Sequence, residues 1–411
     1  MSFAAGTRPL LGVASSSRQT LKKGFHDFIR GRTPGGTYKV PLSSSNIVGV
    51  YSSRGQRPYQ EDTSSAFGLQ LPPQELEASY RERLKTQWDG SKAGSEFFAS
   101  QVGFFGIFDG HGGQEVSTYL KENLHRLTEE ATRAQIPEIV AFTQKHGGYF
   151  KRWRGGALQR WTKNSLSEPG TGMSVLSIEE RLTLAFLQAD KTVLETIDRA
   201  RRCGATATVG LLHSLDTPAE PYWAASKLCL TIAHCGDTRA ILCKTATGEA
   251  TTLTENHHAE SRIESARLRR MGGDRLISDS FGESRWMGVV ENTRSIGDGE
   301  WKPSGITAEP EVRSQIIDGD AYAYLILVTD GLTSLITDQE IVDLARSAPD
   351  PSKAARAIVS FGEDLSAQDN CTCVVVPLKG WGKVGGQDIT KDRREYRRRQ
   401  AGALSTRMQR M

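Results

Sequence analysis

Four acidic sites recur in this 411-residue chain where an apolar run meets a turn. Glu61 and Asp62 end the segment RPYQED, and Asp109 follows the apolar run FFGIF. Asp330 follows YLILVT, and Asp369 stands shortly before CTCVVV. A single Asp-Gly or Asp-Asn pair is usually no more than a turn. Four such sites beside apolar, strand-like runs instead indicate one shared acidic centre.

The chemistry of such a centre follows from its charge. Strands of one sheet can carry their terminal side chains to a common edge, where converging carboxylates repel unless cations neutralise them. Oxygen ligands select the hard ions Mg²⁺ or Mn²⁺. Two such ions about 3.5–4 Å apart can bridge a hydroxide, lower its pKa and hold a phosphoryl oxygen. Gly110 lets the backbone approach closely and offers its carbonyl as a further ligand.

Two basic side chains near these acids suit phosphate chemistry. Arg57, four residues before Glu61, can grip two phosphoryl oxygens with its planar guanidinium. The departing alkoxide of serine or threonine needs a proton donor, and His111 is placed to supply it. A cap or packing residue at a helix start is the structural alternative for His111.

The elements that must position these residues follow from hydrophobic periodicity. Helices are predicted over 178–197, after His111, over 261–271 and over 338–346. Strands are predicted over 104–108, 205–212, 228–234, 322–329 and 371–377. Short gaps between strands, with helices in separate blocks, favour an α+β fold with antiparallel sheet over a doubly wound parallel one.

Composition divides the chain into three parts. Residues 1–40 are a basic segment ending in a linker-like stretch at 31–36, and 41–378 form one domain. Within that domain, the polar stretches near 70–98 and 128–176 are predicted to be insertions or long surface loops. Residues 379–411 form a basic tail, which we expect to be solvated and at most partly helical.

The charge distribution bears on location and partners. Residues 41–378 hold 35 basic and 44 acidic residues, a net charge of −9, between two basic ends. Residues 1–32, which contain no acid before Asp27, resemble a mitochondrial transit peptide, which predicts the matrix. A disordered basic tail and a cytoplasmic location are the alternative. No run approaches the ~20 apolar residues of a membrane span. The basic tail could contact nucleic acid or an anionic membrane, but a solvated tail is favoured and a nucleic-acid partner is not expected.

The six cysteines form no CxxC pair and stand mostly in apolar, strand-like runs. Free cysteines in such runs behave as small core hydrophobes. This pattern fits a reducing compartment better than a disulfide framework or a zinc site.

Eight segments, in order, resemble the metal-dependent protein phosphatase 2C family across about 41–378. They are RPYQED (57–62), FFGIFDGHGG (104–113), GATATVGLL (204–212), HCGDTRAIL (234–242), ENTRSIGD (291–298), AEPEV (308–312), LVTDGL (327–332) and AQDNCTCVVV (367–376). The resemblance implies a sandwich of two antiparallel β-sheets flanked by α-helices, with a dinuclear metal site at one end. It also implies phosphoserine and phosphothreonine proteins as substrates.

The resemblance also assigns roles by position. It implies six metal-binding positions: Asp62, Asp109, Asp330, Asp369, the carbonyl of Gly110, and Glu61 through water. Arg57 would hold phosphate and His111 would be the general acid, both as catalytic residues. Asp237 matches a position linked to a third, weaker metal.

Two departures from the family pattern bear on these roles. Ser334 stands where the family often has a second aspartate, which argues against a third metal at Asp237. Asn256 and Ala259 replace the Asp and Pro of the family's LTxDHxP segment. Because no central ligand is lost, we expect an active phosphatase. We also expect it to be a monomer. A pseudophosphatase that binds phosphoproteins without turnover, and a metal nuclease or small-molecule phosphohydrolase, are the alternatives.

Overall fold

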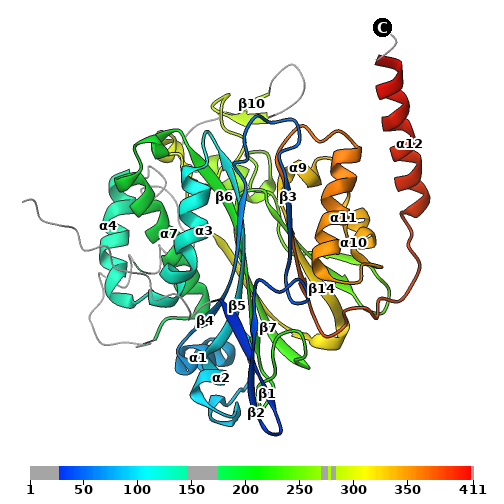
Figure 1. Cartoon of the computed structure of the whole chain (residues 1–411). Helices are drawn as coiled ribbons and strands as arrows, with labels where there is room; N and C mark the ends of the chain where they lie inside the picture. Colours follow the sequence, from blue (N-terminus) through cyan, green and yellow to red (C-terminus); the bar gives the residue numbers. More distant parts are fainter. Residues whose placement is uncertain (1–26, 147–160, 162–174, 270–275, 279–283, 409–411) are drawn as a thin grey trace, which may run out of the picture.

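Two stacked antiparallel β-sheets form the centre of the protein, and helices cover both outer faces (Figure 1). The computed structural model describes residues 27–146, 161, 175–269, 276–278 and 284–408. The first sheet has the order β13-β7-β6-β5-β4, with β12 also paired to β6, and the second has the order β3-β15-β14-β8-β9. The first sheet contains β4 (Thr63–Gln70), β5 (Gln101–His111), β6 (Gly204–Ser214), β7 (Lys227–Cys235), β12 (Ile296–Gly297) and β13 (Glu311–Asp318). The second contains β3 (Gly49–Ser53), β8 (Arg239–Lys244), β9 (Ala250–Thr252), β14 (Tyr322–Val328) and β15 (Cys371–Pro377).

Alternation of side chains along β5 shows how the layers are built. Phe104 and Phe108 belong to the cluster shared with the covering helices, whereas Phe105 and Ile107 pack with residues of the second sheet such as Leu325. Successive strand residues point to opposite faces, so one apolar strand contributes to two cores. The run FFGIF is apolar on both faces because both faces are covered.

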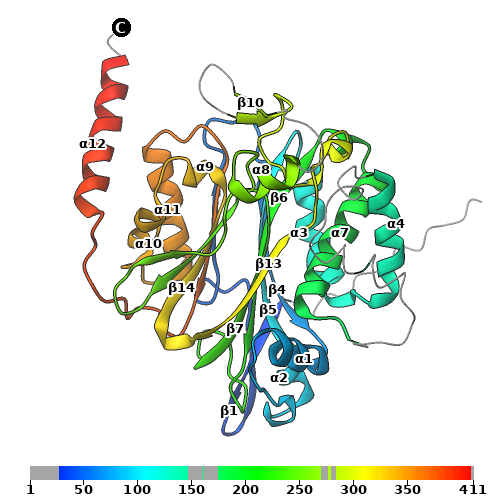
Figure 2. The same cartoon turned by 180° about the vertical axis from the view of Figure 1, so that it is seen from behind.

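The outer layers are α-helical (Figure 2). On the first sheet lie α3 (Glu115–Glu130) and α7 (Ile178–Thr196), with α4 (Ile136–His146) against α7; on the second lie α10 (Asp338–Ala345) and α11 (Pro351–Asp364). Capping boxes begin two of them, Ser177 with Glu180 at α7 and Thr337 with Glu340 at α10. The α+β sandwich flanked by helices, which the sequence predicted, is confirmed. Among the helices of the described ranges, none has the length and apolar character to span a bilayer.

The individual elements agree closely with prediction where the hydrophobic pattern is long. The strand expected at 371–377 is β15, and the helix expected at 178–197 is α7. Strand β5 is longer than the apolar run that predicted it, because its polar ends continue the ladder to β6. The helix expected at 261–271 is α8 (Arg262–Arg269), and its last predicted residues lie outside the described part.

The linker predicted at 31–36 is wrong. It is the turn of a hairpin formed by β1 (Phe28–Thr33) and β2 (Gly36–Pro41). Phe28 and Ile29 are buried, and Ile29 joins the core between the two sheets. Pro34 and Gly35 therefore mark a turn between two paired strands rather than a flexible connection.

The two stretches expected to be irregular surface loops are partly helical. Residues 70–98 form α1 (Pro73–Arg83), the 3₁₀ turn η1 (Gly90–Lys92) and α2 (Glu96–Ser100). Residues 128–146 complete α3 and add η2 (Arg133–Gln135) and α4, whereas most of 147–174 lies outside the described residues. Leu76, Tyr80 and Ile139 are buried in the core. The polar composition of the two stretches gave no sign of this packing.

The basic tail at 379–411 is partly helical, within what the sequence predicted, but its helix contacts the body of the protein. Residues 391–408 form the helix α12 (Lys391–Met408), which lies beside α11 and extends past it (Figure 1). Arg394 pairs with Asp388 at 2.7 Å, and Arg397 pairs with the fully buried Glu340 at 3.0 Å. Part of the basic charge of this segment is thus neutralised by carboxylates of the body, which stabilises the helix against it.

A buried ion network holds the segment before β12 against α8. Glu264, fully buried, accepts hydrogen bonds from Arg267 Nε at 2.8 Å, Thr293 Oγ1 at 2.7 Å and Arg294 Nε at 3.0 Å. Burial opposes ionisation, but the two arginines hold the pKa of Glu264 far below its usual range. Asn292, next to Thr293, donates a hydrogen bond to Asp237 at 2.7 Å, so this network also supports the loop beside that acid.

Replacing Glu264 by glutamine should lower the free energy of unfolding by about 3 kcal/mol, because the buried Arg267 and the partly buried Arg294 lose their counter-charge. Urea unfolding followed by circular dichroism measures the change. Glu249→Gln is the matched control, since Glu249 is exposed and pairs with Lys244 at 2.9 Å in solvent. Equal stability losses in the two variants would contradict the argument.

Candidate metal centre

Strand register explains why acids far apart in sequence meet. Thr63 at the start of β4 pairs with Phe108 near the end of β5, which places Asp62 beside Asp109. Val328 at the end of β14 pairs with Cys373 near the start of β15, which brings Asp330 and Asp369 to the same edge. Antiparallel pairing thus delivers the acids to one end of the sandwich.

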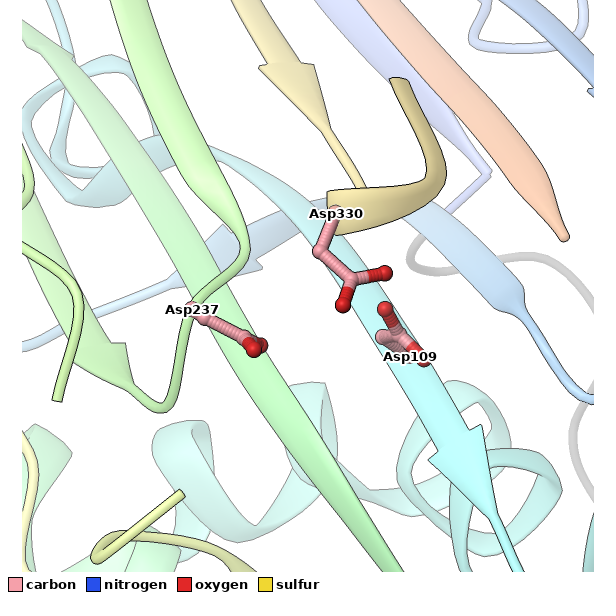
Figure 3. A group of neighbouring side chains, drawn as sticks. All are labelled: Asp109, Asp237 and Asp330. Atoms are coloured by element: carbon pink, nitrogen blue, oxygen red, sulfur yellow. The ribbon is translucent and has the colours of Figure 1, made fainter. Parts of the chain in front are cut away.

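Three carboxylates form the tightest group at this edge. Each of Asp109, Asp237 and Asp330 offers an oxygen within 4.8 Å of the others. Asp109 lies on β5, Asp237 in the loop after β7 and Asp330 at the start of α9 (Asp330–Thr333), and all three side chains point toward a common space (Figure 3). They line a pocket of about 400 Å³ together with Arg57, Glu61, Gly110, His111 and Asp369.

Asp62 lies outside that group of three but contacts it. Its side chain is buried, its Oδ2 accepts a hydrogen bond from Thr329 Oγ1 at 2.9 Å, and its Oδ1 has no partner among the described residues. Burial and the nearby Asp369 raise its pKa to about 7. A buried carboxylate oxygen without a donor is costly unless a cation satisfies it.

Burial, followed by mutual repulsion, determines the electrostatics of the centre. Burial, followed by the charges of Asp62, Asp330 and Asp237, raises the pKa of Asp109 well above its usual value. Burial, with Asp237 and Asp369, raises the pKa of Asp330 to about 7. A set of oxygen donors that resists ionisation by itself fits hard divalent cations, which would supply the missing positive charge.

Gly110 is glycine for a steric reason. A Cβ at this position would lie 2.5 Å from the carbonyl oxygen of Glu61 and 2.8 Å from Ser117 Oγ. Ser117 Oγ also donates to that same carbonyl at 2.5 Å, which ties the segment before β4 to α3. The backbone of Glu61 is fixed further by Asn370, whose Oδ1 accepts from the Glu61 N–H at 2.7 Å. Gly110 is therefore closely packed against the backbone of Glu61, and the role of its carbonyl as a metal ligand stays a prediction.

Arg57 and Asp369 are brought together as an ion pair. Arg57 Nη2 lies 2.7 Å from Asp369 Oδ2, and the two side chains are 55% and 41% exposed. Both line the acidic pocket, so the guanidinium stands at its mouth rather than within the buried cluster. This position leaves its other N–H groups accessible to an anionic ligand.

Asp237 occupies a more central position than the sequence suggested. Asn292 Nδ2 donates to its Oδ2 at 2.7 Å, and His258 Nε2 lies 3.2 Å from the same oxygen. Burial alone would raise the pKa of Asp237, but the bonds to His258 and Asn292 lower it. Ser334 instead bonds locally to the carbonyl of Gly331 at 3.3 Å. The charge of Asp237 is thus already stabilised by hydrogen bonds from His258 and Asn292.

His111 is held by a residue to which the sequence argument gave no role. Its Nε2 lies 2.8 Å from Oδ2 of the buried Asp298, which also accepts from Ser295 Oγ at 2.5 Å. Burial would lower the pKa of His111, but Asp298 outweighs it and raises that pKa. A Cβ on Gly204 would lie 2.4 Å from Asp298 Oδ2, so only glycine fits beneath this pair. The segment ENTRSIGD, which ends in Asp298, was the available signal.

Comparison with known proteins agrees with this geometry. The profile of the family "Protein phosphatase 2C" matches residues 79–371. "Protein phosphatase 2C homolog 4" of Schizosaccharomyces pombe is 34% identical over 380 residues, covering 90% of this chain and 91% of that protein. "Protein phosphatase 1K, mitochondrial" of Xenopus laevis is 26% identical over 352 residues, covering 83% and 79%.

A solved structure supports the fold. The serine-threonine phosphatase 2C of Toxoplasma gondii superposes with a TM-score of 0.51 at 17% identity, over 86% of this chain and 98% of that one. The family assignment rests on two findings. The family profile matches most of the chain, and the similarity to the Schizosaccharomyces pombe protein extends over 90% of it. The chain belongs to the protein phosphatase 2C family and is a serine/threonine protein phosphatase.

Proposed function

We propose that this phosphatase hydrolyses phosphoserine and phosphothreonine in proteins with two Mg²⁺ or Mn²⁺ ions bound at the acidic centre. The residues that would hold them are Asp62, Asp109, Asp330, Asp369, the carbonyl of Gly110 and, through water, Glu61. The observation that carries the proposal is the convergence of Asp62, Asp109 and Asp330 at one end of the sandwich, where burial and mutual repulsion raise the pKa of each. When bound, such a pair of ions supplies a water molecule of lowered pKa and positive charge opposite the phosphoryl oxygens.

The chain's own residues then bind and orient the phosphate. Arg57, at the pocket mouth, grips phosphoryl oxygens with the N–H groups that Asp369 leaves accessible. Asp298 bonds Nε2 of His111, so Nδ1 is the nitrogen that donates a proton to the departing serine or threonine oxygen. Asp237, already bonded to His258 and Asn292, supports the centre from the side; a third ion there remains the weaker assignment.

The full chain should hydrolyse a phosphothreonine peptide with Mn²⁺ or Mg²⁺ and lose this activity in EDTA. Arg57→Ala should raise KM about tenfold with a smaller change in kcat, because one charge-assisted contact to phosphate is lost. Steady-state kinetics measure both. Full turnover in EDTA would contradict the proposal, and metal-independent peptide binding without turnover would favour the binding-module alternative.

We also propose a mitochondrial location for this phosphatase. The acid-free first 26 residues support it, as do the names of two relatives, the Xenopus protein and "Probable protein phosphatase 2C member 13, mitochondrial" of rice, which is 28% identical over 283 residues. Phosphoproteins of the matrix are then the candidate substrates.

The folded body already includes the β1–β2 hairpin, because Ile29 packs in the core. Residues 1–26 can therefore be deleted without removing part of that core, which makes the location testable. Deleting residues 1–26 should leave a fluorescent fusion of the protein in the cytosol, whereas the full chain should co-localise with a matrix marker. Fusing residues 1–26 to an unrelated fluorescent protein provides the matched control. Mitochondrial import of the truncated form would exclude the proposed signal.

A further inference from the structure

A second cleft, of about 480 Å³, opens beside the acidic pocket. It is lined by Gly112, Asp198, Arg199, Arg201, Arg202 and Glu300. Gly112 and Arg202 line the acidic pocket as well, so the two cavities adjoin. Half of the lining residues are arginines, in a body whose net charge is negative. A group bound in this cleft would lie next to His111 without occupying the metal centre.

The backbone that carries these arginines is fixed. They lie on η3 (Asp198–Arg201) and the residue after it, between α7 and β6. The N–H groups of Gly299 and Glu300 donate to the carbonyls of Ala200 and Arg201 at 3.0 and 2.9 Å. Ala200 is fully buried beneath the turn. The guanidinium groups are thus presented from a rigid base, which reduces the entropy lost when a ligand binds.

The three arginines differ in how many of their N–H groups are already bound by other residues of the protein. Arg199 pairs with Glu115 at 2.6 Å and donates to the carbonyl of Gly112 at 3.0 Å, so its role is partly structural. Arg202 pairs with Glu300 through Nε at 2.7 Å, while its side chain is 83% exposed. Arg201 is exposed and makes no ion pair with any described residue. Asp198 also lines the cleft, so the acids beside the arginines balance their charge, but Arg201 and the outer N–H groups of Arg202 are not bound by any of these acids.

We propose that this cleft is a substrate subsite for an anionic side chain, a carboxylate or a second phosphate, near the scissile phosphoresidue of the phosphoprotein. The inference rests on the proposed function, because it places the scissile phosphate in the adjoining pocket. Guanidinium groups match both anions with paired N–H donors. The subsite makes the enzyme selective for acidic or multiply phosphorylated segments over neutral ones.

The test compares three phosphothreonine peptides of one length on the full chain with Mn²⁺. The positions flanking the phosphothreonine carry glutamine in the first peptide, glutamate in the second and phosphoserine in the third. Flanks on the N-terminal and C-terminal sides are assayed separately. At low ionic strength the wild type should show kcat/KM about fivefold higher for at least one anionic flank than for the neutral peptide. Phosphoserine preferred over glutamate would identify phosphate as the ligand, whereas equal preference would identify any anion.

Variants decide whether the cleft is responsible. Arg201→Gln should reduce the ratio between anionic and neutral peptides toward one, and the R201Q/R202Q double variant should abolish it. Arg81→Gln, an exposed arginine on α1 at the opposite end of the molecule (Figure 1), should keep the wild-type ratio. A ratio of one in the wild type, or a ratio unchanged in the double variant, would overturn the subsite. EDTA-sensitive hydrolysis of the neutral peptide would still support the proposed function in either case.

Discussion

Asp109→Asn is expected to lower kcat for a phosphothreonine peptide by about 10³-fold or more, because an amide is a poor ligand for hard cations and removes charge from the centre. Asp109 is surrounded by other acids, since the charges of Asp62, Asp330 and Asp237 all act on it. Rates measured over a range of Mn²⁺ concentrations should show that excess metal does not restore the activity.

The same substitution should stabilise the metal-free protein. Removing one buried charge from a repelling cluster should raise Tm in EDTA by a few degrees. Wild-type protein should gain stability as Mn²⁺ is added, because ligands that bind the folded state stabilise it by mass action, and this gain should shrink in the variant. Calorimetry with and without Mn²⁺ measures both effects.

Asp392→Asn is the matched control, because Asp392 is exposed on α12, away from the acidic centre. It should change neither the rate nor the response of Tm to Mn²⁺. An Asp109 variant that loses stability in EDTA while keeping its response to Mn²⁺ would mean that the acids are not a metal centre.

His111→Gln should lower the rate for phosphothreonine peptides by about 10²-fold, the usual contribution of a positioned proton donor. The loss should be much smaller for an aryl phosphate, whose leaving group departs without protonation. This dependence on the leaving group separates proton donation from a structural role, because a misfolded site would slow both substrates alike. Parallel kinetics on the peptide and on p-nitrophenyl phosphate measure it.

Asp298 is expected to act through His111 as a positioning residue. Asp298→Asn should retain the geometry but weaken the bond at His111 Nε2, giving a loss of about tenfold on the peptide and a smaller one on the aryl phosphate. Asp320→Asn, an exposed residue paired with Lys379 at 2.8 Å, should leave both rates unchanged. Equal losses on the two substrates would assign Asp298 a purely structural role.

Prediction from sequence succeeded where a physical pattern was local. Strand β15 is apolar on both faces and α7 carries a long apolar stripe, so the sequence predicted the type and the approximate bounds of each element. Asp109 and Asp330 stand directly after such runs, so the strands that carry them also indicated a common edge. The ordered family segments then implied roles for these residues, which stay predictions.

Prediction failed where stability depends on distant partners. Residues 391–408 are too polar to indicate a packed helix, and only Asp388, Glu340 and other acids of the body reveal what its arginines contact. The hairpin at 28–41 was hidden because Pro34 and Gly35 mark a tight turn and a linker equally well. In both places the deciding contacts are long-range.

For this protein, the sequence by itself determined the fold class, the family and the convergence of Asp109 and Asp330, because strand periodicity and strand-end acids are local properties. Only the tertiary structure decided that Asp298 holds His111, that Asp237 joins Asp109 and Asp330, and that Arg201 and Arg202 line a cleft beside them. These relations depend on strand register and on loops packed from separate parts of the chain, and no local pattern encodes such distances.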